Sequence, residues 1–480
     1  MLRVVAVRRR LLPLLLLLLG LPSLRVAAQK AGRHGVAQDW PQFGWDAASS
    51  GAPPGTTGIT AGNIASLYRR QVQLDGTVDA SAIYLHGVTV NGSNRDVFFV
   101  TTSYGKTIAV DADSGAVLWE YTPPGYSAWA GTTQITNSTP AADPDRQNIY
   151  AASPDGNVQK LAIADGHVVW TTAITLLPNR EKIASPLREF RGRIIAVTGG
   201  YIGDATPYQG HVAVLDAQTG ALQHVWNSLC SDRAGLIEPG SCRSSRSAIW
   251  GRAGAVIDPA TGNIFVATGN GPYDGKTDWG DSVIELVPDA TQVLANYSPA
   301  DNATLEGDDL DLGSTSPVLL GADVLAQGGK DGLIRMLGIG AMAGVDPHMG
   351  NELQTMPSRS LMFTAAAVWR QAEVTWMFAA DSDGTAAWIA GNGNLTQVWS
   401  NRTSGTSPVV AGGLLYVYDA SRGLHVYDAR SGRQIANLDC GGGHWNSPIV
   451  VDGRIALPEG SANDHATFGV LNIWTVTAAQ

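Results

Sequence analysis

The chain has 480 residues, a formal net charge of −10 at pH 7 and only 15% charged residues. An acidic chain without Lys/Arg clusters beyond its first residues excludes nucleic acid as the expected partner, because phosphate binding needs basic patches. The 56 glycines, the 24 prolines and the evenly spread β-branched residues predict an all-β protein.

The first expected element is an export signal. Four arginines precede the leucine-rich run 11–24, which is too short to span a bilayer, and small residues follow at 26–28. We predict a signal peptide over residues 1–28 and one mature domain over 29–480, exported to the periplasm or the extracellular space. The signal holds five arginines and no acid, so its removal shifts the net charge from −10 to about −15, which favours cationic partners, including a metal ion.

The segment after the signal contains "DWPQFGWDAASSG" (39–51) and "TAGNIASLYRR" (60–70), for which we predict a helix. A repeat follows. "GKTIAVDADSGAVLWEY" (from Gly105), "GNVQKLAIADGHVVWTT" (from Gly156), "GHVAVLDAQTGALQHVW" (from Gly210) and "RGLHVYDARSGRQIANL" (from Arg422) each contain a strand, a turn with Asp and Gly, and a second strand. Upstream of the hairpins stand "NSTPAAD", "ASPLREF", "STSPVLL", "TSPVVAG" and "NSPIVVD".

Counting degenerate copies, eight units begin at about Asp79, with a spacing of roughly 40 to 70 residues, as expected for propeller blades. One four-stranded blade cannot bury both faces, so the units must stack around an axis. We therefore predict an eight-bladed β-propeller of four-stranded antiparallel blades, in which the N-terminal segment lends a strand to the last blade and closes the ring. Four tryptophans are expected as wedges between blades, in the core: Trp119, Trp170, Trp226 and Trp399.

The chain has three cysteines. Cys230 and Cys242 flank a loop that a disulfide could close in an oxidising compartment, and Cys440 is left over. The sequence contains no C-x-x-C-H motif and no paired-cysteine zinc pattern, so neither covalent haem nor structural zinc is expected.

"DWPQFGWDAASSG" together with "AVDADSGAVLW" and "AVLDAQTGAL" resembles the PQQ (pyrroloquinoline quinone) repeat family. That family includes quinoprotein alcohol dehydrogenases and the propeller lipoprotein of the machinery that assembles outer-membrane β-barrels. The resemblance covers nearly the whole mature chain. It is specific for the fold and less so for the chemistry, because enzymes and scaffolds share the repeat.

The resemblance implies a calcium site that holds PQQ. In "ATGNGPYD", Asn270 matches the asparagine whose amide oxygen ligates calcium in the enzymes, although Gly-Asn-Gly is also a good turn. Asp204 in "TGGYIGDATPYQG" lies near the position of an acidic calcium ligand that is Glu in the family, and a solvated loop carboxylate is its alternative. In "LEGDDLDLGSTSP", Asp308 and Asp311 match two acids, of which Asp311 matches the catalytic base and a further metal ligand.

Lys330 in "LAQGGKDGLIRML" matches the cation that reaches the quinone oxygens, and an ordinary hairpin turn is the alternative. Trp250 is close to the place of the tryptophan on which PQQ stacks. The adjacent-cysteine disulfide that covers the other face of PQQ in the enzymes has no counterpart in the sequence. His444 and Trp445 could line the same channel mouth or simply be packed.

These matches imply an exported oxidoreductase that resembles PQQ- and calcium-dependent alcohol dehydrogenases, with a small-molecule alcohol or a polymer as substrate and an external electron acceptor. The alternative is a non-catalytic propeller, a scaffold for envelope assembly or a binding module that has lost the cofactor. A sugar- or polymer-binding propeller is a third interpretation. No span across a membrane is expected after the signal.

Overall fold

The structure is a computed structural model that describes residues 38–476 except 359, 373 and 392. All described residues belong to one compact unit, which covers residues 34–480. The predicted signal peptide, residues 1–28, lies outside the described residues. Among the described helices, none is long and apolar enough to cross a membrane.

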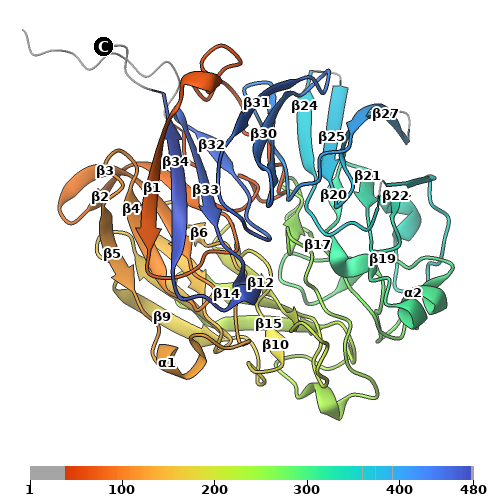
Figure 1. Ribbon diagram of the computed structural model, residues 1–480. Coiled ribbons are helices and arrows are strands. Elements are labelled where there is room, and N and C mark those ends of the chain that lie inside the picture. Colours follow the sequence, from red (N-terminus) through yellow and green to blue (C-terminus); the bar gives the residue numbers. More distant parts are fainter. Residues whose placement is uncertain (1–37, 359, 373, 392, 477–480) are drawn as a thin grey trace, which may run out of the picture. The chain divides into compact units, whose positions relative to one another are not determined.

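The described strands form eight four-stranded antiparallel sheets, the blades of the predicted propeller (Figure 1). The first blade contains β2 (Ile83–Val90), β3 (Ser93–Thr101), β4 (Thr107–Asp111) and β5 (Val117–Tyr121). The second contains β6 (Ala141–Ala142), β7 (Asn148–Ala152), β8 (Asn157–Ala162) and β9 (Val168–Ala173). The third contains β11 (Arg188–Phe190), β12 (Arg193–Val197), β14 (His211–Asp216) and β15 (Leu222–Asn227). The fourth contains β16 (Val256–Ile257), β17 (Ile264–Ala267), β18 (Val283–Leu286) and β19 (Val293–Tyr297).

The remaining blades follow the same order of strands. The fifth contains β20 (Val318–Leu319), β21 (Val324–Gln327), β22 (Leu333–Gly338) and β23 (Gln354–Pro357). The sixth contains β24 (Ala367–Gln371), β25 (Val374–Ala380), β26 (Thr385–Gly391) and β27 (Asn394–Asn401). The seventh contains β28 (Val409–Ala411), β29 (Leu414–Asp419), β30 (Gly423–Asp428) and β31 (Gln434–Leu438). The eighth contains β32 (Ile449–Val451), β33 (Arg454–Glu459), β34 (Gly469–Thr475) and β1 (Tyr68–Leu74).

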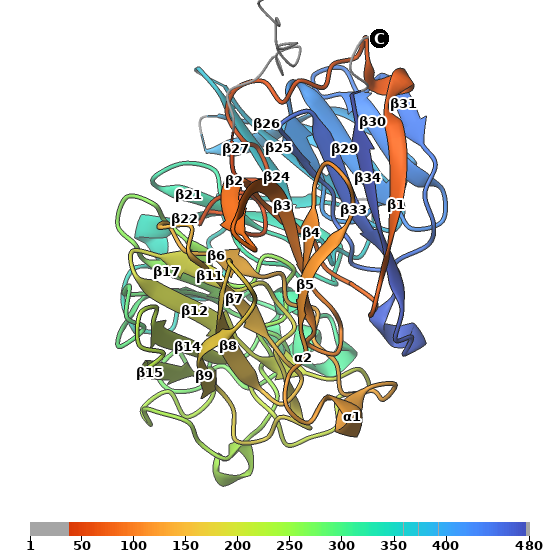
Figure 2. The same cartoon turned by 90° about the vertical axis from the view of Figure 1, so that its left-hand side faces the viewer.

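The eighth blade combines strands from both parts of the chain. β1 pairs with β34 in a register that runs from Tyr68 opposite Thr475 to Leu74 opposite Gly469, and Figure 2 shows the two strands side by side. The helix predicted over residues 60–70 is wrong, because only η1 (Ile64–Ser66) is helical and β1 follows at once. Pairing with β34 outweighs the weak helix propensity of this segment.

The other elements are short and lie in connections between the blade strands. A two-stranded sheet pairs β10 with β13. These elements are β10 (Glu181–Lys182), β13 (Gly199–Gly200), α1 (Tyr126–Trp129), α2 (Asn302–Asp308), η2 (Pro239–Ser241), η3 (Leu312–Ser314), η4 (Ile339–Met342) and η5 (Ala462–Asp464).

The hydrophobic core is divided into clusters that each join consecutive blades. Phe99 of the first blade and Ile149 of the second belong to one cluster. The largest cluster joins the seventh, eighth and first blades through residues such as Tyr416, Ile455 and Val100. Burial of apolar side chains therefore holds each blade to its neighbours, including the last to the first.

Tryptophans at the outer strands contact the turns of the next blade, as predicted. The indole Nε1 of Trp119 donates to Ile163 O (2.8 Å), and that of Trp399 donates to Ala429 O (3.0 Å). Trp170 donates to Ala217 O in the same way (3.3 Å). Trp226 packs in the cluster shared by the third and fourth blades.

An ion-pair network also joins the eighth blade to the first. The buried Arg454 guanidinium lies 2.9 Å from Asp96 Oδ2 and 2.6 Å from Asp113 Oδ1. His86 Nδ1 lies 3.0 Å from Asp96 and 3.2 Å from Asp452. Arg454 also contacts Asp452 (3.1 Å), so it supplies positive charge within this group of potential metal ligands.

The segment 40–57 crosses the inner strands of the ring. Its backbone is hydrogen-bonded to residues in or beside the inner strands of six blades: Tyr84, Ala142, Ile257, Val368, Val410 and Gly453. The fully buried Arg188 donates from Nη2 to Ala253 O (2.7 Å) and also contacts Phe43 and Ser49 of this segment. This part of the chain therefore fills the channel among the inner strands.

The contact between tryptophan and glycine can be tested by adding one methyl group. A Cβ on Gly220 would lie 2.5 Å from Trp170, whereas a Cβ on Gly192 would meet nothing within 4 Å, and both residues have positive φ (75° and 78°). We expect Gly192→Ala to cost about 1–2 kcal/mol for the left-handed backbone alone. Gly220→Ala should cost about 1–3 kcal/mol more through overpacking. Urea unfolding measures both values, and equal losses would contradict the wedge.

Candidate functional site

The predicted site residues all lie at one end of the ring. Because the strands of a blade alternate in direction, the connections after its second and fourth strands leave from the same end. Asn270, Lys330 and Asp204 follow second strands (β17, β21 and β12). Trp250 and Asp311 lie on connections that follow fourth strands (β15 and β19). We call this end the mouth.

Asn270 and Asp311 are in direct contact. The backbone N–H of Asn270 donates to Asp311 Oδ1 (2.8 Å), and its side-chain Nδ2 donates to Asp309 Oδ1 (2.7 Å). A Cβ on Gly269 would lie 2.6 Å from Asp311 Oδ1, so glycine is needed for this approach. The side-chain oxygen Oδ1 of Asn270 is buried and has no hydrogen-bond partner among the described residues. Asn270 therefore connects the loop after β17 to the acidic loop that contains Asp309 and Asp311.

Lys330 completes the cluster. Its Nζ lies 2.7 Å from Asp311 Oδ2 and 3.1 Å from Asp309 Oδ1, and its backbone N–H donates to Asp311 O (3.0 Å). The ammonium also lies 5.4 Å from the centre of the Trp250 ring. The structure thus brings together Asn270, Asp311, Lys330 and Trp250, which the sequence singled out.

Burial and charge act in opposite directions on this cluster. Burial raises the pKa of Asp311, while the Lys330 ammonium and the Asn270 N–H act to lower it. Burial alone would lower the pKa of Lys330, but the carboxylates of Asp311 and Asp309 raise it overall. Lys330 therefore remains a cation, and Asp311 has a higher proton affinity than an exposed aspartate.

In the acidic loop 308–311, Asp309 makes contacts that were not expected, whereas Asp308 lies at the surface. Asp308 is the last residue of α2 and is exposed. Its neighbour Asp309 has a left-handed backbone (φ 56°) and makes the contacts to Asn270 and Lys330. The run of three acids in "GDDLD" indicated this loop, but it did not show which carboxylates would contact Asn270 and Lys330.

Asp204 lies apart from the cluster. It is exposed, has φ 49° and accepts a hydrogen bond from Tyr208 Oη (2.9 Å). Burial, together with the nearby Asp204 and the Asp311 carboxylate, raises the pKa of Tyr208. Both carboxylates are therefore near this tyrosine, but the described hydrogen bonds and ion pairs do not join Asp204 to Asn270 or Asp311.

A buried carboxylate that sequence reasoning missed supports the cluster from behind. Asp281 is fully buried, its backbone N–H donates to Gly269 O (2.8 Å), and its Oδ1 accepts from Leu312 N–H (3.0 Å). It therefore ties the residue before Asn270 to the residue after Asp311. Its Oδ2 is buried and has no partner among the described residues, and burial raises the pKa of Asp281 to about 8.

A row of aromatic rings continues from Trp250. The ring centre of Phe363 lies 6.1 Å from that of Trp250 and 6.1 Å from that of Trp445. The ring centre of His444 lies 4.3 Å from that of Trp445. The Nδ1 atom of His444 lies 2.9 Å from the buried carboxylate of Asp79. Sequence reasoning named His444 and Trp445 as residues that could line the mouth and missed Phe363 and Asp79.

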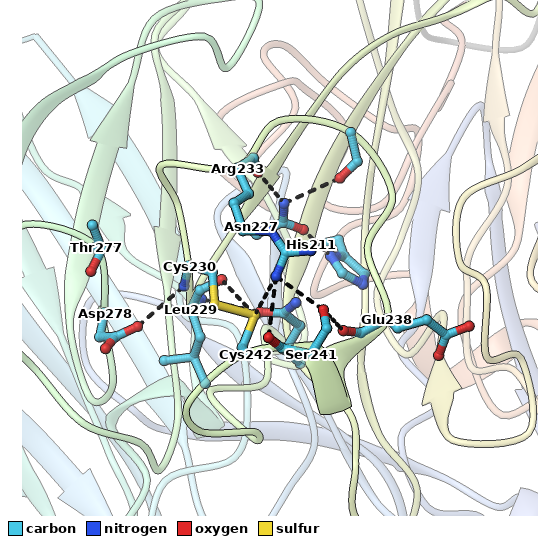
Figure 3. Close-up of a disulfide and its surroundings, with 12 residues drawn as sticks. His211, Asn227, Leu229, Cys230, Arg233, Glu238, Ser241, Cys242, Thr277 and Asp278 are labelled. Carbon is cyan, nitrogen blue, oxygen red and sulfur yellow. Dashed lines mark hydrogen bonds between the residues drawn. A yellow bond between two sulfur atoms is a disulfide. The ribbon is translucent and has the colours of Figure 1, made fainter.

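The predicted disulfide between Cys230 and Cys242 is present (Figure 3). Cys230 N–H donates to Asp278 Oδ1 (3.1 Å), in the loop that follows Asn270. Figure 3 shows Arg233 on the other side of the bridge, where its Nη1 donates to Ser241 Oγ (3.0 Å). The disulfide thus braces the mouth without lying against Trp250, so it does not replace the missing adjacent-cysteine pair. Cys440 is a free, partly buried thiol.

The fold and the site define an eight-bladed propeller with a charged mouth. The family model described as outer membrane protein assembly factor BamB, a PQQ-repeat model, matches residues 70–271 and 376–469. Because these residues make up more than half of the chain, the protein belongs to this PQQ-repeat β-propeller family, as the sequence predicted.

The chain is similar to curated dehydrogenases. Quinohemoprotein alcohol dehydrogenase ADH IIB of Pseudomonas putida is 26% identical over 313 residues, which are 58% of this chain and 43% of that protein. Polyvinylalcohol dehydrogenase of a Pseudomonas species is 24% identical over 288 residues, 54% of this chain and 43% of that protein. The chain thus spans less than half the length of these relatives.

Solved structures share the fold. Quinohemoprotein alcohol dehydrogenase from Comamonas testosteroni superposes with a TM-score of 0.66 at 16% identity, covering 92% of this chain and 81% of that one. BamB from Moraxella catarrhalis superposes with a TM-score of 0.53 at 13% identity, covering 86% of this chain and 99% of that one. At these identities the likeness shows the propeller alone.

Asp281 gives a pH test of this arrangement. The pKa of Asp281 is about 8 in the folded protein and about 4 in the unfolded chain. The folded state therefore binds the proton more tightly, and this contribution to stability is complete below about pH 4 and is lost as the pH rises toward about 8. In metal-free buffer with EDTA, Asp281→Asn should therefore gain stability over the wild type between pH 4 and 8, by at most about 1.4 kcal/mol per pH unit. Urea unfolding measures the difference, and parallel pH curves would contradict it.

Proposed function

We propose that the protein is a PQQ- and calcium-dependent oxidoreductase of the alcohol dehydrogenase type. The observation that carries the proposal is the cluster of Asn270, Asp311 and Lys330 beside Trp250 at the mouth. The curated relatives support the same class of activity. An exported location, in the periplasm or outside the cell, is part of the proposal, as is an external electron acceptor.

The oxygen atoms of the cluster fit a calcium ion. Calcium prefers hard oxygen ligands, and amide carbonyls are normal members of such a set. Asn270 offers a buried Oδ1 that has no hydrogen-bond partner among the described residues, and the carboxylates of Asp311 and Asp309 stand next to it. These three residues would hold the ion, and Asp204 remains the proposed additional ligand on the neighbouring loop.

The residues around Trp250 fit a planar quinone. Trp250 is partly exposed, so its ring offers a stacking surface, and the Lys330 ammonium lies within 5.4 Å of the ring centre. When bound, PQQ supplies the quinone that accepts a hydride from the alcohol carbon. Lys330 places fixed positive charge where negative charge would develop.

Asp311 is the proposed base. Its carboxylate would accept the proton of the alcohol hydroxyl. Lys330, at 2.7 Å, fixes the position of this carboxylate, and the N–H of Asn270 fixes its other oxygen. The positions of both carboxylate oxygens are thus set by hydrogen bonds before an alcohol binds.

A non-catalytic scaffold is the second candidate. The matching family model is described as outer membrane protein assembly factor BamB, and the solved BamB propeller shares the fold. The sequence also lacks the adjacent-cysteine pair of the enzymes. A scaffold would bind envelope proteins and would need neither PQQ nor calcium.

Binding and turnover distinguish the two candidates. We expect the purified protein to bind Ca²⁺, and its luminescent substitute Tb³⁺, at the mouth and to reduce a dye with primary or secondary alcohols once PQQ is present. Asn270→Ala should weaken Tb³⁺ binding at least about tenfold, because it removes the buried Oδ1. Asn94→Ala is the control, since Asn94 is exposed on β3 and bonds Gly87 O. Absence of Tb³⁺ binding and of any change in the PQQ spectrum would favour the scaffold.

A further inference from the structure

The aromatic row reaches across the mouth of the ring. Trp250 lies on the connection into the fourth blade, Phe363 on that into the sixth and Trp445 on that into the eighth. The fourth and eighth blades stand opposite each other in an eight-bladed ring. With neighbouring ring centres 6.1 Å apart, the three rings therefore form a continuous floor across the channel. We call them the aromatic floor.

The floor offers surface to a ligand. Each of the three rings is partly exposed, although the residues around them are largely buried. Neighbouring planes are tilted by 46° and 45°, so a planar ligand stacked on Trp250 would meet the Phe363 ring at an angle. Below it, the segment 40–57 fills the channel among the inner strands.

A cation lies over each of the two outer rings of the floor. Lys330 Nζ lies 5.4 Å from the Trp250 ring, and the Arg252 guanidinium lies 5.5 Å from the Trp445 ring. Arg252 is 3% exposed and donates from Nη1 to Ala184 O (3.0 Å) and from Nη2 to Asn137 O (3.5 Å), while its Nε has no partner among the described residues. An anionic aromatic ligand on the floor would thus have a cation near each of its ends.

Asp79 fixes the far end of the floor. Its buried carboxylate accepts from Trp445 N–H (2.6 Å), from Asn137 Nδ2 (2.9 Å) and from Ala462 N–H (3.0 Å), and it lies 2.9 Å from His444 Nδ1. Two of these four contacts hold Trp445 and His444, and the other two tie the Asp79 carboxylate to Asn137 and Ala462 on two further connections. Rigid aromatic surfaces lose little entropy when a planar ligand stacks on them.

We propose that Phe363 and Trp445 extend the stacking surface of Trp250, so that the three-ring floor holds the planar, polycarboxylate quinone PQQ from one side in place of a two-sided clamp. The inference rests on the proposed function. It assigns to this chain two stacking residues and one cation over the Trp445 ring, Arg252, that act together with Trp250 and Lys330. The extended floor supplies contact area that the absent adjacent-cysteine pair would otherwise provide.

Isothermal titration of the metal-loaded protein with PQQ tests the floor without any turnover. Phe363→Ala and Trp445→Ala should each raise the Kd for PQQ about tenfold, as expected for the loss of one aromatic contact. Trp445→Phe and Phe363→Leu keep apolar volume and should give smaller increases, so the test survives if an alanine variant fails to fold. Phe468→Ala is the matched control, because Phe468 is 72% exposed on the β33–β34 connection.

The outcomes separate the two proposals. If the wild type binds PQQ and all floor variants bind it with an unchanged Kd, the floor is overturned and the proposed function stands. If the wild type itself gives neither heat nor a spectral change with PQQ, the proposed function fails and the floor fails with it. A selective loss in the floor variants, with Phe468→Ala unaffected, supports the inference.

Discussion

Burial between consecutive blades is the constraint on which the rest of this structure depends. A four-stranded blade has two apolar faces and can bury them only against its neighbours, so the chain must close a ring. The clusters that join successive blades, and the one that joins the seventh, eighth and first, show this division of the core. Hydrogen bonds run within the blades, whereas side chains such as Trp119 and Trp399 connect them.

Closure of the ring also determines where chemistry can occur. The connections after the second and fourth strands of every blade meet at one end, while the segment 40–57 fills the channel among the inner strands. Burying a charge costs free energy unless the charge is paired. At the mouth, Lys330 pairs with Asp311. Burial raises the pKa of Asp281. The Oδ1 atom of Asn270 accepts no hydrogen bond from the described residues. The mouth therefore combines paired charges with a buried oxygen that has no hydrogen-bond partner among the described residues.

The sequence predicted the architecture well because the repeat carries it. The strand–turn–strand units, the Asp and Gly of their turns and the periodic tryptophans are local signals, and the structure has them where they were expected. The helix over residues 60–70 was wrong because a distant partner, β34, decides the conformation of β1. The residues around β1 in the sequence give no information about this pairing with β34.

The contacts within the candidate site could be predicted only in part, for a similar reason. Asn270, Asp311 and Lys330 stand in motifs that can be recognised one at a time, and the structure brings them into contact. Asp309, Asp281 and Phe363 could not be found in this way, because their roles come from backbone turns and from packing between different blades. Asp204 was chosen from its place in a loop, and its contact with Tyr208 depends on how that loop folds. Its role as a metal ligand stays a prediction.

The most direct test of the account is a crystal structure of the protein with PQQ and a lanthanide in place of calcium. Anomalous scattering would locate the ion independently of the protein coordinates. The account predicts an ion about 2.3–2.6 Å from Asn270 Oδ1 and from a carboxylate oxygen of Asp311, with the quinone lying on Trp250. An ion bound elsewhere, or a mouth without ion and quinone at saturating concentrations of both, would contradict it.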